Sequence, residues 1–227
     1  MFYYYGRKKQ IARYYPSPVH DVLIEPFAGA AAYALHADHW RREVILIEKD
    51  ARVASIWDWL INEATPQKIL SLPDLREGEK SSDFLHIVHA ATKMAFNYRT
   101  IKATAVLARN WEISRRIMAS SVHKVKHWTI INGDYSEAPD IDATWFVDPP
   151  YKADAGTGYA HGSDKLDYEK LANWILVRRG QVMCCEGEAG DYLPFKRLLD
   201  LNGIAGKRSK EYVFYKGSPM DIQCQLI

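Results

Sequence analysis

Five short apolar runs recur along the chain, and they constrain its fold more than any other feature. Most are rich in β-branched residues and several end in an acid, which is typical of strands buried in a parallel sheet. Two segments between them, 28–41 and 51–63, have compositions suited to helices. The alternation predicts an α/β fold with a doubly wound, mostly parallel sheet. The five runs are Val22–Glu25, Val44–Glu48, Trp128–Ile131, Thr144–Asp148 and Gln181–Cys185.

A long segment interrupts this alternation. Residues 63–127 open with two prolines, pass through a charged loop and then have a helical composition. Because the segment is too long for a single crossover, we predict an inserted helical subdomain there. Residues 1–62 and 128–227 would form the main domain, and 227 residues suffice for one such core. Near the C-terminus, runs at 204–208 and 211–216, separated by Ser209-Lys210, predict an antiparallel hairpin at the sheet edge.

The inserted segment is strongly basic, although the whole chain has a net charge of only +2. Aromatic residues, Phe96, Tyr98 and Trp111, are interleaved with its cations. Such a pattern fits a surface that follows phosphates and stacks against bases. A solvated helical face that is merely basic is the alternative. The predicted nucleic-acid contacts are Lys93, Arg99, Lys102, Arg109, Arg115, Arg116, Lys124 and Lys126.

Three of the predicted strands end in acids, Glu25, Glu48 and Asp148. In an open α/β sheet the ligand crevice lies at the carboxyl ends of the strands. The turn after Glu25 contains small residues that let a ligand approach the backbone, but it has neither a GxGxxG nor a GxxxxGK pattern. An acid at the position of Glu48 can accept hydrogen bonds from ribose hydroxyls. We therefore expect a nucleoside cofactor without phosphates, with a surface acid as the alternative for Glu48.

The sequence Asp148-Pro149-Pro150-Tyr151 follows a predicted buried strand. Two consecutive prolines fix the backbone and remove two amide donors, so the carbonyls of this turn can act as acceptors. An exocyclic amine carries two N–H donors, of which Asp148 and the Pro149 carbonyl could accept one each. Tyr151 offers a face for stacking a base. A stiff, proline-rich loop is the alternative interpretation.

Taken together and in this order, the motifs resemble those of the Dam-like DNA adenine-N6 methyltransferases, including short phage-type members. Tyr4-Tyr5-Gly6-Arg7-Lys8 is similar to the family's aromatic-x-Gly-Gly-Lys stretch, and residues 25–29 are similar to its Glu-Pro-Phe-x-Gly motif. Gly133-Asp134-Tyr135 precedes the strand that leads to Asp148, as in the family. Two departures occur: Arg7 replaces the second glycine, and Ala30-Ala31 continue a turn in which the family usually has more glycine.

The resemblance implies a Rossmann-like methyltransferase fold. It also implies that S-adenosylmethionine donates a methyl group to the N6 amine of adenine in double-stranded DNA. The inserted segment would be the target-recognition subdomain; it is shorter than in Dam, and the resemblance does not imply which DNA sequence is recognised. The implied catalytic residues are Asp148, Pro149, Pro150 and Tyr151. The implied cofactor-binding residues are Tyr4, Lys8, Glu25, Phe27, Gly29, Glu48, Asp134, Tyr135 and Asp148.

Other functions stay open on the sequence alone. An N4-cytosine methyltransferase needs the same amine geometry, RNA or a protein amide could be the substrate, and an inactive DNA-binding module could keep the fold. A cognate restriction endonuclease could accompany the protein or be absent. No cysteine stands in a Pro-Cys context of the kind that methylation of a ring carbon would require.

Metal and membrane binding are not expected. The histidine pairs 36/39, 86/89 and 123/127 have helical spacing, but no cysteine or third ligand joins any of them. No run of about 18 apolar residues occurs, and the N-terminus becomes basic too early for a signal peptide. We therefore expect a cytoplasmic protein without a metal.

Overall fold

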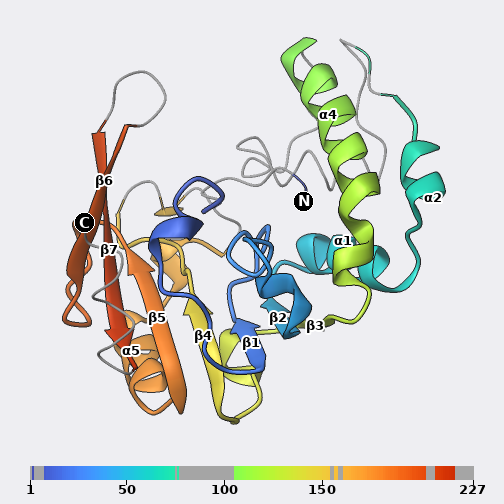
Figure 1. Ribbon diagram of the computed structural model, residues 1–227. Helices are drawn as coiled ribbons and strands as arrows, with labels where there is room; N and C mark the ends of the chain where they lie inside the picture. Colours follow the sequence, from blue (N-terminus) through green and yellow to red (C-terminus); the bar gives the residue numbers. More distant parts are fainter. Residues whose placement is uncertain are drawn as a thin grey trace.

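A seven-stranded, mostly parallel sheet runs through the computed structural model (Figure 1). The structure describes residues 2, 8–74, 76, 105–153, 156–157, 161–202 and 208–217. In this part of the chain the strand order is β3-β2-β1-β4-β5-β7-β6. The strands are β1 (Val22–Glu25), β2 (Glu43–Glu48), β3 (Thr129–Asn132), β4 (Ala143–Val147), β5 (Gly180–Glu186), β6 (Lys196–Asn202) and β7 (Arg208–Lys216).

The described helices connect and cover these strands. They comprise α-helices and short 3₁₀ helices, and side-chain caps mark several of their starts, such as Asp50 before α1 and Asp167 before α5. The α-helices are α1 (Ala51–Asn62), α2 (Pro66–Leu70), α4 (Ala105–Ser121) and α5 (Tyr168–Leu176). The 3₁₀ helices are η1 (Ala12–Tyr14), η2 (His39–Arg41), η4 (Val122–Val125), η5 (Tyr135–Glu137) and η7 (Ser163–Lys165).

The strand order reverses between β1 and β4. The chain places β2 and β3 successively on one side of β1, and then returns to the other side of β1 with β4 and β5. All of these neighbours pair in parallel. The five predicted strands and the α/β class with a mostly parallel sheet are therefore confirmed. Ligand sites in such sheets lie at the carboxyl ends of the strands beside the reversal, here the ends of β1 and β4.

Both faces of the sheet are covered, because successive strand residues point to opposite sides. Leu46, Phe146 and Met183 belong to a core shared with α1, the C-terminal half of α4 and the N-terminal segment. Ile45, Trp145 and other alternate residues belong to a second core shared with α5 and η5. The hydrophobic runs thus fill two layers, which explains why they lack a simple polar alternation.

The prediction of a helix over residues 28–41 is wrong. This segment consists of turns followed by η2, although it is rich in alanine. Gly29, Ala31 and Ala37 have positive φ angles of 46°, 45° and 46°, which a right-handed helix cannot contain. In addition, the Ala34 N–H donates to the Glu25 carboxylate at 2.6 Å instead of to a helical carbonyl. A strand-end acid therefore organises the turn.

Ala37 provides a test of this turn geometry. It is exposed and has a left-handed φ, so its Cβ costs free energy without adding buried area. We expect Ala37→Gly to raise the free energy of unfolding by about 0.5–1 kcal/mol. The matched control is Ala51→Gly at the exposed start of α1, which should lower it by a similar amount. Urea unfolding measures both, and a destabilised Ala37→Gly protein would contradict the assigned backbone.

The C-terminal hairpin is present at the sheet edge, but its boundaries differ from the prediction. β7 pairs antiparallel with both β5 and β6, and Asn202 pairs with Arg208. Ser209 and Lys210, which were predicted to form the turn, lie inside β7, and most of the predicted run 204–208 lies outside the described residues. The first strand of the hairpin is instead the polar segment Lys196–Asn202. An edge strand tolerates such polarity, because it is covered less completely than a central strand.

The described parts of the inserted segment share the main core. Trp111 of α4 is 2% exposed and donates its indole N–H to the Pro73 carbonyl at 2.9 Å. Met118 and Val122 pack in the same cluster as Leu23 and Leu46 of the sheet. The prediction that Trp111 stacks against nucleic-acid bases is therefore wrong, because its ring is buried.

Two elements extend past the carboxyl ends of the central strands. α4 rises on one side of the molecule, and the β6–β7 hairpin rises on the other (Figure 1). β5 ends at Glu186, opposite Tyr212, whereas the pairing of β6 with β7 continues to Asn202 and Arg208. The candidate ligand edge therefore lies between two projecting elements. Among the described helices, none has the length and apolarity that a membrane span requires.

Candidate active site

Asp148 follows β4 directly and forms a buried cluster with the N-terminal segment. The Lys8 ammonium lies 2.8 Å from Asp148 Oδ1, and the Lys8 side chain is only 8% exposed. The same ammonium lies 4.4 Å from the centroid of the Tyr151 ring. Three predicted site residues, Lys8, Asp148 and Tyr151, are thus brought into contact. Tyr4, also predicted for this site, lies outside the described residues.

A second carboxylate, Glu211 of β7, completes this cluster. It is 3% exposed, and its Oε1 accepts hydrogen bonds from the hydroxyls of Tyr15 and Tyr151. Lys8 Nζ lies 3.8 Å from the same oxygen. The sequence prediction missed Glu211 and Tyr15. A signal for Glu211 was present, because the period of two in β7 places it on the same face as Val213 and Tyr215, which pack against the core.

Burial governs the electrostatics of the cluster. It raises the pKa of Asp148 to about 6, with Lys8 opposing the shift and Glu211 adding to it. Burial alone would lower the pKa of Lys8, but Asp148 and Glu211 outweigh it and raise that pKa. At neutral pH the Asp148 carboxylate and the Lys8 ammonium are therefore both charged. A carboxylate held in this way is an acceptor only, as an amine substrate would require.

The two prolines shape the turn after Asp148. Pro149 is buried, and within the described residues no donor is bonded to its carbonyl oxygen, whereas the Pro150 carbonyl accepts the Tyr168 hydroxyl at 2.7 Å. The Lys152 N–H, one residue after Tyr151, donates to the fully buried Glu186 at the end of β5. The backbone after the motif is therefore fixed from α5 and from β5, while one carbonyl beside Asp148 keeps its acceptor capacity.

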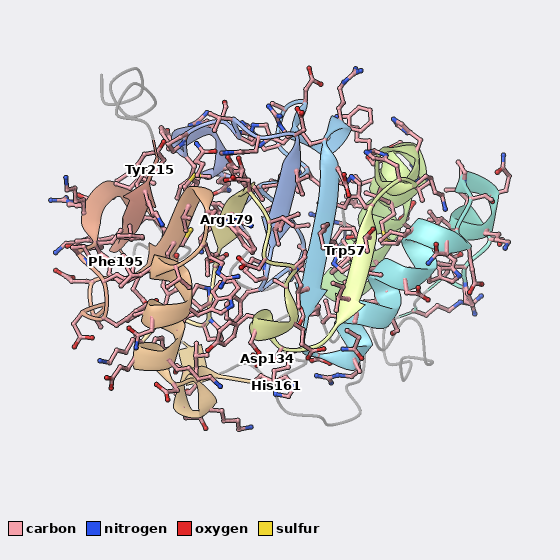
Figure 2. The ribbon with its side chains drawn as sticks, turned by 90° about the horizontal axis from the view of Figure 1, so that it is seen from below. Trp57, Asp134, His161, Arg179, Phe195 and Tyr215 are labelled. Carbon is pink, nitrogen blue, oxygen red and sulfur yellow. The ribbon has the colours of Figure 1, made fainter. Side chains whose placement is uncertain are left out.

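Glu48 organises the turn after β1. It ends β2, and its two carboxylate oxygens accept the N–H groups of Gly29 and Asp50, both at 2.9 Å. The Gly29 carbonyl in turn accepts the indole N–H of Trp57 at 2.8 Å, and Figure 2 shows Trp57 among the side chains beside the sheet. Burial raises the pKa of Glu48 to about 7. Each carboxylate oxygen has a second lone pair, so hydroxyl donors can still bind Glu48.

Glu25, at the end of β1, is buried without a cation among the described residues. It is 2% exposed, and the Ala34 N–H is its hydrogen-bond donor. Burial, with a smaller contribution from the nearby charge of Asp148, raises the pKa of Glu25 to about 8. Acids that are buried (Glu25, Glu48) or partly buried (Asp148) therefore lie at the carboxyl ends of β1, β2 and β4, which are adjacent strands. This edge of the sheet favours a ligand that brings positive charge and hydrogen-bond donors.

Asp134 and Tyr135 lie after β3, on the neighbouring part of the same edge. Asp134 caps η5 and accepts from Lys49 Nζ at 2.9 Å. Burial alone would raise the pKa of Asp134, but the hydrogen bonds from Lys49 and Ser136 outweigh it and lower that pKa. His161 belongs to the segment after the motif. Burial and the charge of nearby Lys49 lower the pKa of His161. Figure 2 shows the side chains of Asp134 and His161 on this part of the molecule.

The side chains of Phe27 and Tyr135 contact each other. Their rings are stacked, with centroids 5.5 Å apart and an interplanar angle of 25°. Tyr135 is 6% exposed and also packs edge-on against Trp174. These two predicted cofactor-binding residues therefore form an aromatic wall between the turn after β1 and η5.

The predicted DNA-binding cations fall into three groups. Arg109 is exposed on α4, and Arg116 is exposed and paired with Glu112. Lys124 and Lys126 lie at or just after η4, at the amino edge of the sheet, where Lys126 binds the last carbonyls of α1 and Lys124 lies over Trp40. That edge is opposite to Asp148. Those outside the described residues are Lys93, Arg99 and Lys102.

Arg115 connects two elements of the protein through its hydrogen bonds. Its guanidinium donates to the Leu72 carbonyl and to Asp74, and its side chain is 14% exposed. It thereby ties α4 to the end of α2. Two of its donor groups are thus already bonded to acceptors of the protein, which leaves Arg115 less available for a DNA contact than Arg109.

This difference between neighbouring arginines is testable. We expect Arg115→Ala to lower the free energy of unfolding by about 2 kcal/mol, since charge-assisted hydrogen bonds and packing are lost together. Arg116→Ala removes only an exposed ion pair and should change it by less than about 0.5 kcal/mol. Chemical unfolding of both variants provides the comparison. Equal stabilities would show that the Arg115 contacts contribute nothing.

Histidines do not form a metal site in the described part of the chain, where no group of three potential ligands occurs. His39 is buried against the Tyr33 carbonyl, and burial lowers its pKa to about 4. His123 and His127 pack against Trp40. Each of these rings therefore has a packing role.

Comparison with known proteins identifies no relative: no protein-family profile matches the chain, and no curated protein is significantly similar to it. Its function must be inferred from its own residues.

Proposed function

We propose that the protein transfers a methyl group from S-adenosylmethionine to an exocyclic amine of a DNA base, namely the N6 amine of adenine in double-stranded DNA. The observation that carries this proposal is Asp148 with its proline turn, which lies at the strand-order reversal beside Lys8 and Tyr151. The resemblance of the motifs to Dam-like enzymes supplies the choice of adenine. The geometry supports an amine as the acceptor of the methyl group.

The residues at the strand ends fit this cofactor. S-adenosylmethionine is a nucleoside with ribose hydroxyls, an ammonium group and a positively charged sulfur, and it has no phosphates. Glu48 is placed to accept the ribose hydroxyls, as strand-end acids do in related folds, and Glu25 lies on the adjacent strand. Of the described cations at this edge, Lys8 and Lys49 are already paired with acids. Where these acids are ionised, they would disfavour the phosphates of a dinucleotide or ATP.

The chain's own residues would orient the target amine. Asp148 accepts one N–H, the Pro149 carbonyl accepts the other, and the nitrogen lone pair then points away from both toward the bound cofactor. Tyr151 supports the base in the plane that this geometry requires. The cofactor, when bound, would supply the methyl group from its sulfonium, and breaking that S–C bond would leave a neutral thioether. After the transfer the nitrogen becomes acidic, and Asp148 or water takes its proton, so orientation and exclusion of water carry most of the rate.

The target adenine must leave the double helix to reach Asp148, because the Asp148 side chain is only 20% exposed and a base within the duplex could not contact it. α4 and the β6–β7 hairpin project on either side of the site (Figure 1). The exposed Arg109 lies on α4 and would contact a phosphate. We propose that DNA lies across the edge between these two elements.

Cofactor affinity should depend on pH in a defined direction. Glu48 must be ionised to accept both N–H groups and hydroxyls, and its pKa is raised to about 7. Its carboxylate is therefore lost as the pH falls through 7. We expect affinity for S-adenosylmethionine to rise roughly five- to tenfold between pH 6 and 7.5, since one proton must leave. Calorimetry in buffers of different ionisation enthalpy measures the affinity and the released proton, and flat affinity would contradict the role of Glu48.

The proposed reaction is tested by incubating the purified protein with methyl-labelled S-adenosylmethionine and, separately, unmodified duplex DNA, RNA and protein. Label should appear in DNA alone, and the Asp148→Ala protein is the control for contaminating activity. Label in RNA or protein without label in DNA would overturn the substrate assignment. Cofactor binding without transfer to any substrate would favour an inactive DNA-binding module.

A further inference from the structure

Glu211 makes a convergent set of contacts that the proposed mechanism leaves unused. β7 runs antiparallel beside β5 and brings this carboxylate from the far end of the chain to the cluster around Asp148. Its Oε1 accepts hydroxyl hydrogens from Tyr15 and Tyr151 and lies 3.8 Å from Lys8 Nζ. A nearly inaccessible glutamate with three such neighbours is costly to bury, so its contacts need an explanation.

The position of Lys8 explains why a buried carboxylate is present at Glu211. Its ammonium donates toward Asp148 Oδ1 at 2.8 Å and lies 4.4 Å from the centre of the Tyr151 ring. In the proposed reaction the substrate makes the same two contacts, because its amine donates to Asp148 and its base lies against Tyr151. Lys8 therefore occupies the place of an amine at Asp148 while the protein is free. A substrate amine that takes this place must leave the buried ammonium without its nearest carboxylate, which is unfavourable unless another anion is close.

We propose that Glu211 is a positioning residue that fixes Tyr151 through its hydroxyl and receives the Lys8 ammonium when a substrate amine binds Asp148. A shift of Lys8 across the gap to Glu211 keeps the ammonium paired and opens Asp148. The identity of the incoming amine rests on the proposed function, whereas the exchange of Lys8 between two carboxylates is a property of the free protein and can be tested without DNA.

Acetylation of Lys8 by a pulse of acetic anhydride, read by mass spectrometry, measures how well the ammonium is held. The adjacent, exposed Lys9 is the internal reference. The proteins compared are the wild type, Asp148→Asn, Glu211→Gln and the double variant. We expect Lys8 to stay nearly as protected in Asp148→Asn as in the wild type, because Glu211 takes it over. In the double variant, labelling relative to Lys9 should rise about tenfold or more, which corresponds to one pKa unit.

The opposite result is equally defined. If Asp148→Asn alone exposes Lys8 as fully as the double variant does, Glu211 is not a second partner and the proposal is wrong. Circular dichroism checks that each protein is folded. If the double variant does not fold, Asp148→Asn combined with Glu211→Asp replaces it, because the shorter side chain withdraws the carboxylate from Lys8 and should also speed labelling.

Methyl transfer gives a second readout. Glu211→Gln should lower kcat roughly 10- to 100-fold through misplacement of Tyr151 and retention of Lys8 at Asp148, with the KM for S-adenosylmethionine unchanged. Tyr151→Phe, which keeps the Glu211 charge, should leave Lys8 labelling unchanged. An inactive wild-type protein would refute the proposed function while the labelling result still decides the role of Glu211. An active wild type with unaltered kcat in Glu211→Gln would overturn the positioning role alone.

Discussion

Replacing Asp148 with alanine is expected to lower the rate of methyl transfer by roughly 1,000-fold or more, while the affinity for S-adenosylmethionine changes little. In the proposed reaction Asp148 orients the target amine, and its ion pair with Lys8 holds the carboxylate in place. Without it, the Pro149 carbonyl alone cannot align the nitrogen lone pair. Single-turnover kinetics with saturating DNA measures the chemical step, and calorimetry measures cofactor binding.

Asp148→Asn is the conservative companion to this variant. It keeps the size of the side chain but places an N–H₂ group where acceptors are needed, so its activity should also be low. Asp142→Ala is the matched control, because Asp142 is an exposed acid just before β4, at the other end of the strand. Wild-type turnover by Asp148→Ala would show that the catalytic assignment is wrong.

Replacing Glu48 with alanine is expected to weaken S-adenosylmethionine binding roughly 10- to 100-fold, the loss that follows from removing charge-assisted hydrogen bonds. Two effects would add: the proposed acceptor of the ribose hydroxyls is removed, and the N–H groups of Gly29 and Asp50 lose the carboxylate that fixes the turn. Calorimetric titration with the cofactor provides the measurement.

Glu43 offers the control for Glu48. It is an exposed glutamate at the opposite, amino end of the same strand, so Glu43→Ala should bind the cofactor as the wild type does. If Glu48→Ala also binds normally while remaining folded, the cofactor does not lie at the end of β2. The assignment of the strand-end acids would then have to be abandoned.

Much of the architecture could be predicted from the sequence, because buried strands and helices have recognisable patterns of apolar residues. β1, β2 and β4 are continuous apolar runs that end beside Glu25, Glu48 and Asp148, and the structure places these acids on adjacent strands. The helix α1 also matches its prediction closely. In each case the pattern that identifies the element lies within a few consecutive residues.

The features that local patterns did not predict involve contacts between distant residues. An alanine-rich composition favours a helix over 28–41, but Glu25 and left-handed backbone at Ala31 and Ala37 replace it with turns. Arg115 belongs to a basic segment, yet its partners are Leu72 and Asp74. Such partners depend on how separate elements pack, and no local pattern encodes them.

The candidate site likewise combines residues that a local motif predicts with residues that only the fold brings together. Asp148 and Tyr151 were predicted from a short motif, whereas Glu211 belongs to the site only because β7 is inserted next to β5. Its hydrogen bond from Tyr15 joins residues separated by 196 positions. The pairing of Lys8 with Asp148 likewise requires the N-terminal segment to cross to the carboxyl end of β4. Topology, rather than local composition, creates this cluster.

Nucleoside analysis of DNA methylated by the protein tests the central claim most directly. Unmethylated DNA is incubated with the purified protein and S-adenosylmethionine, digested to nucleosides and examined by mass spectrometry, with Asp148→Ala in parallel. We predict N6-methyladenine in the wild-type sample and none in the variant sample. N4-methylcytosine would keep the amine chemistry but refute adenine as the target, and the absence of any methylated nucleoside across DNAs of diverse sequence would contradict DNA methylation by this protein.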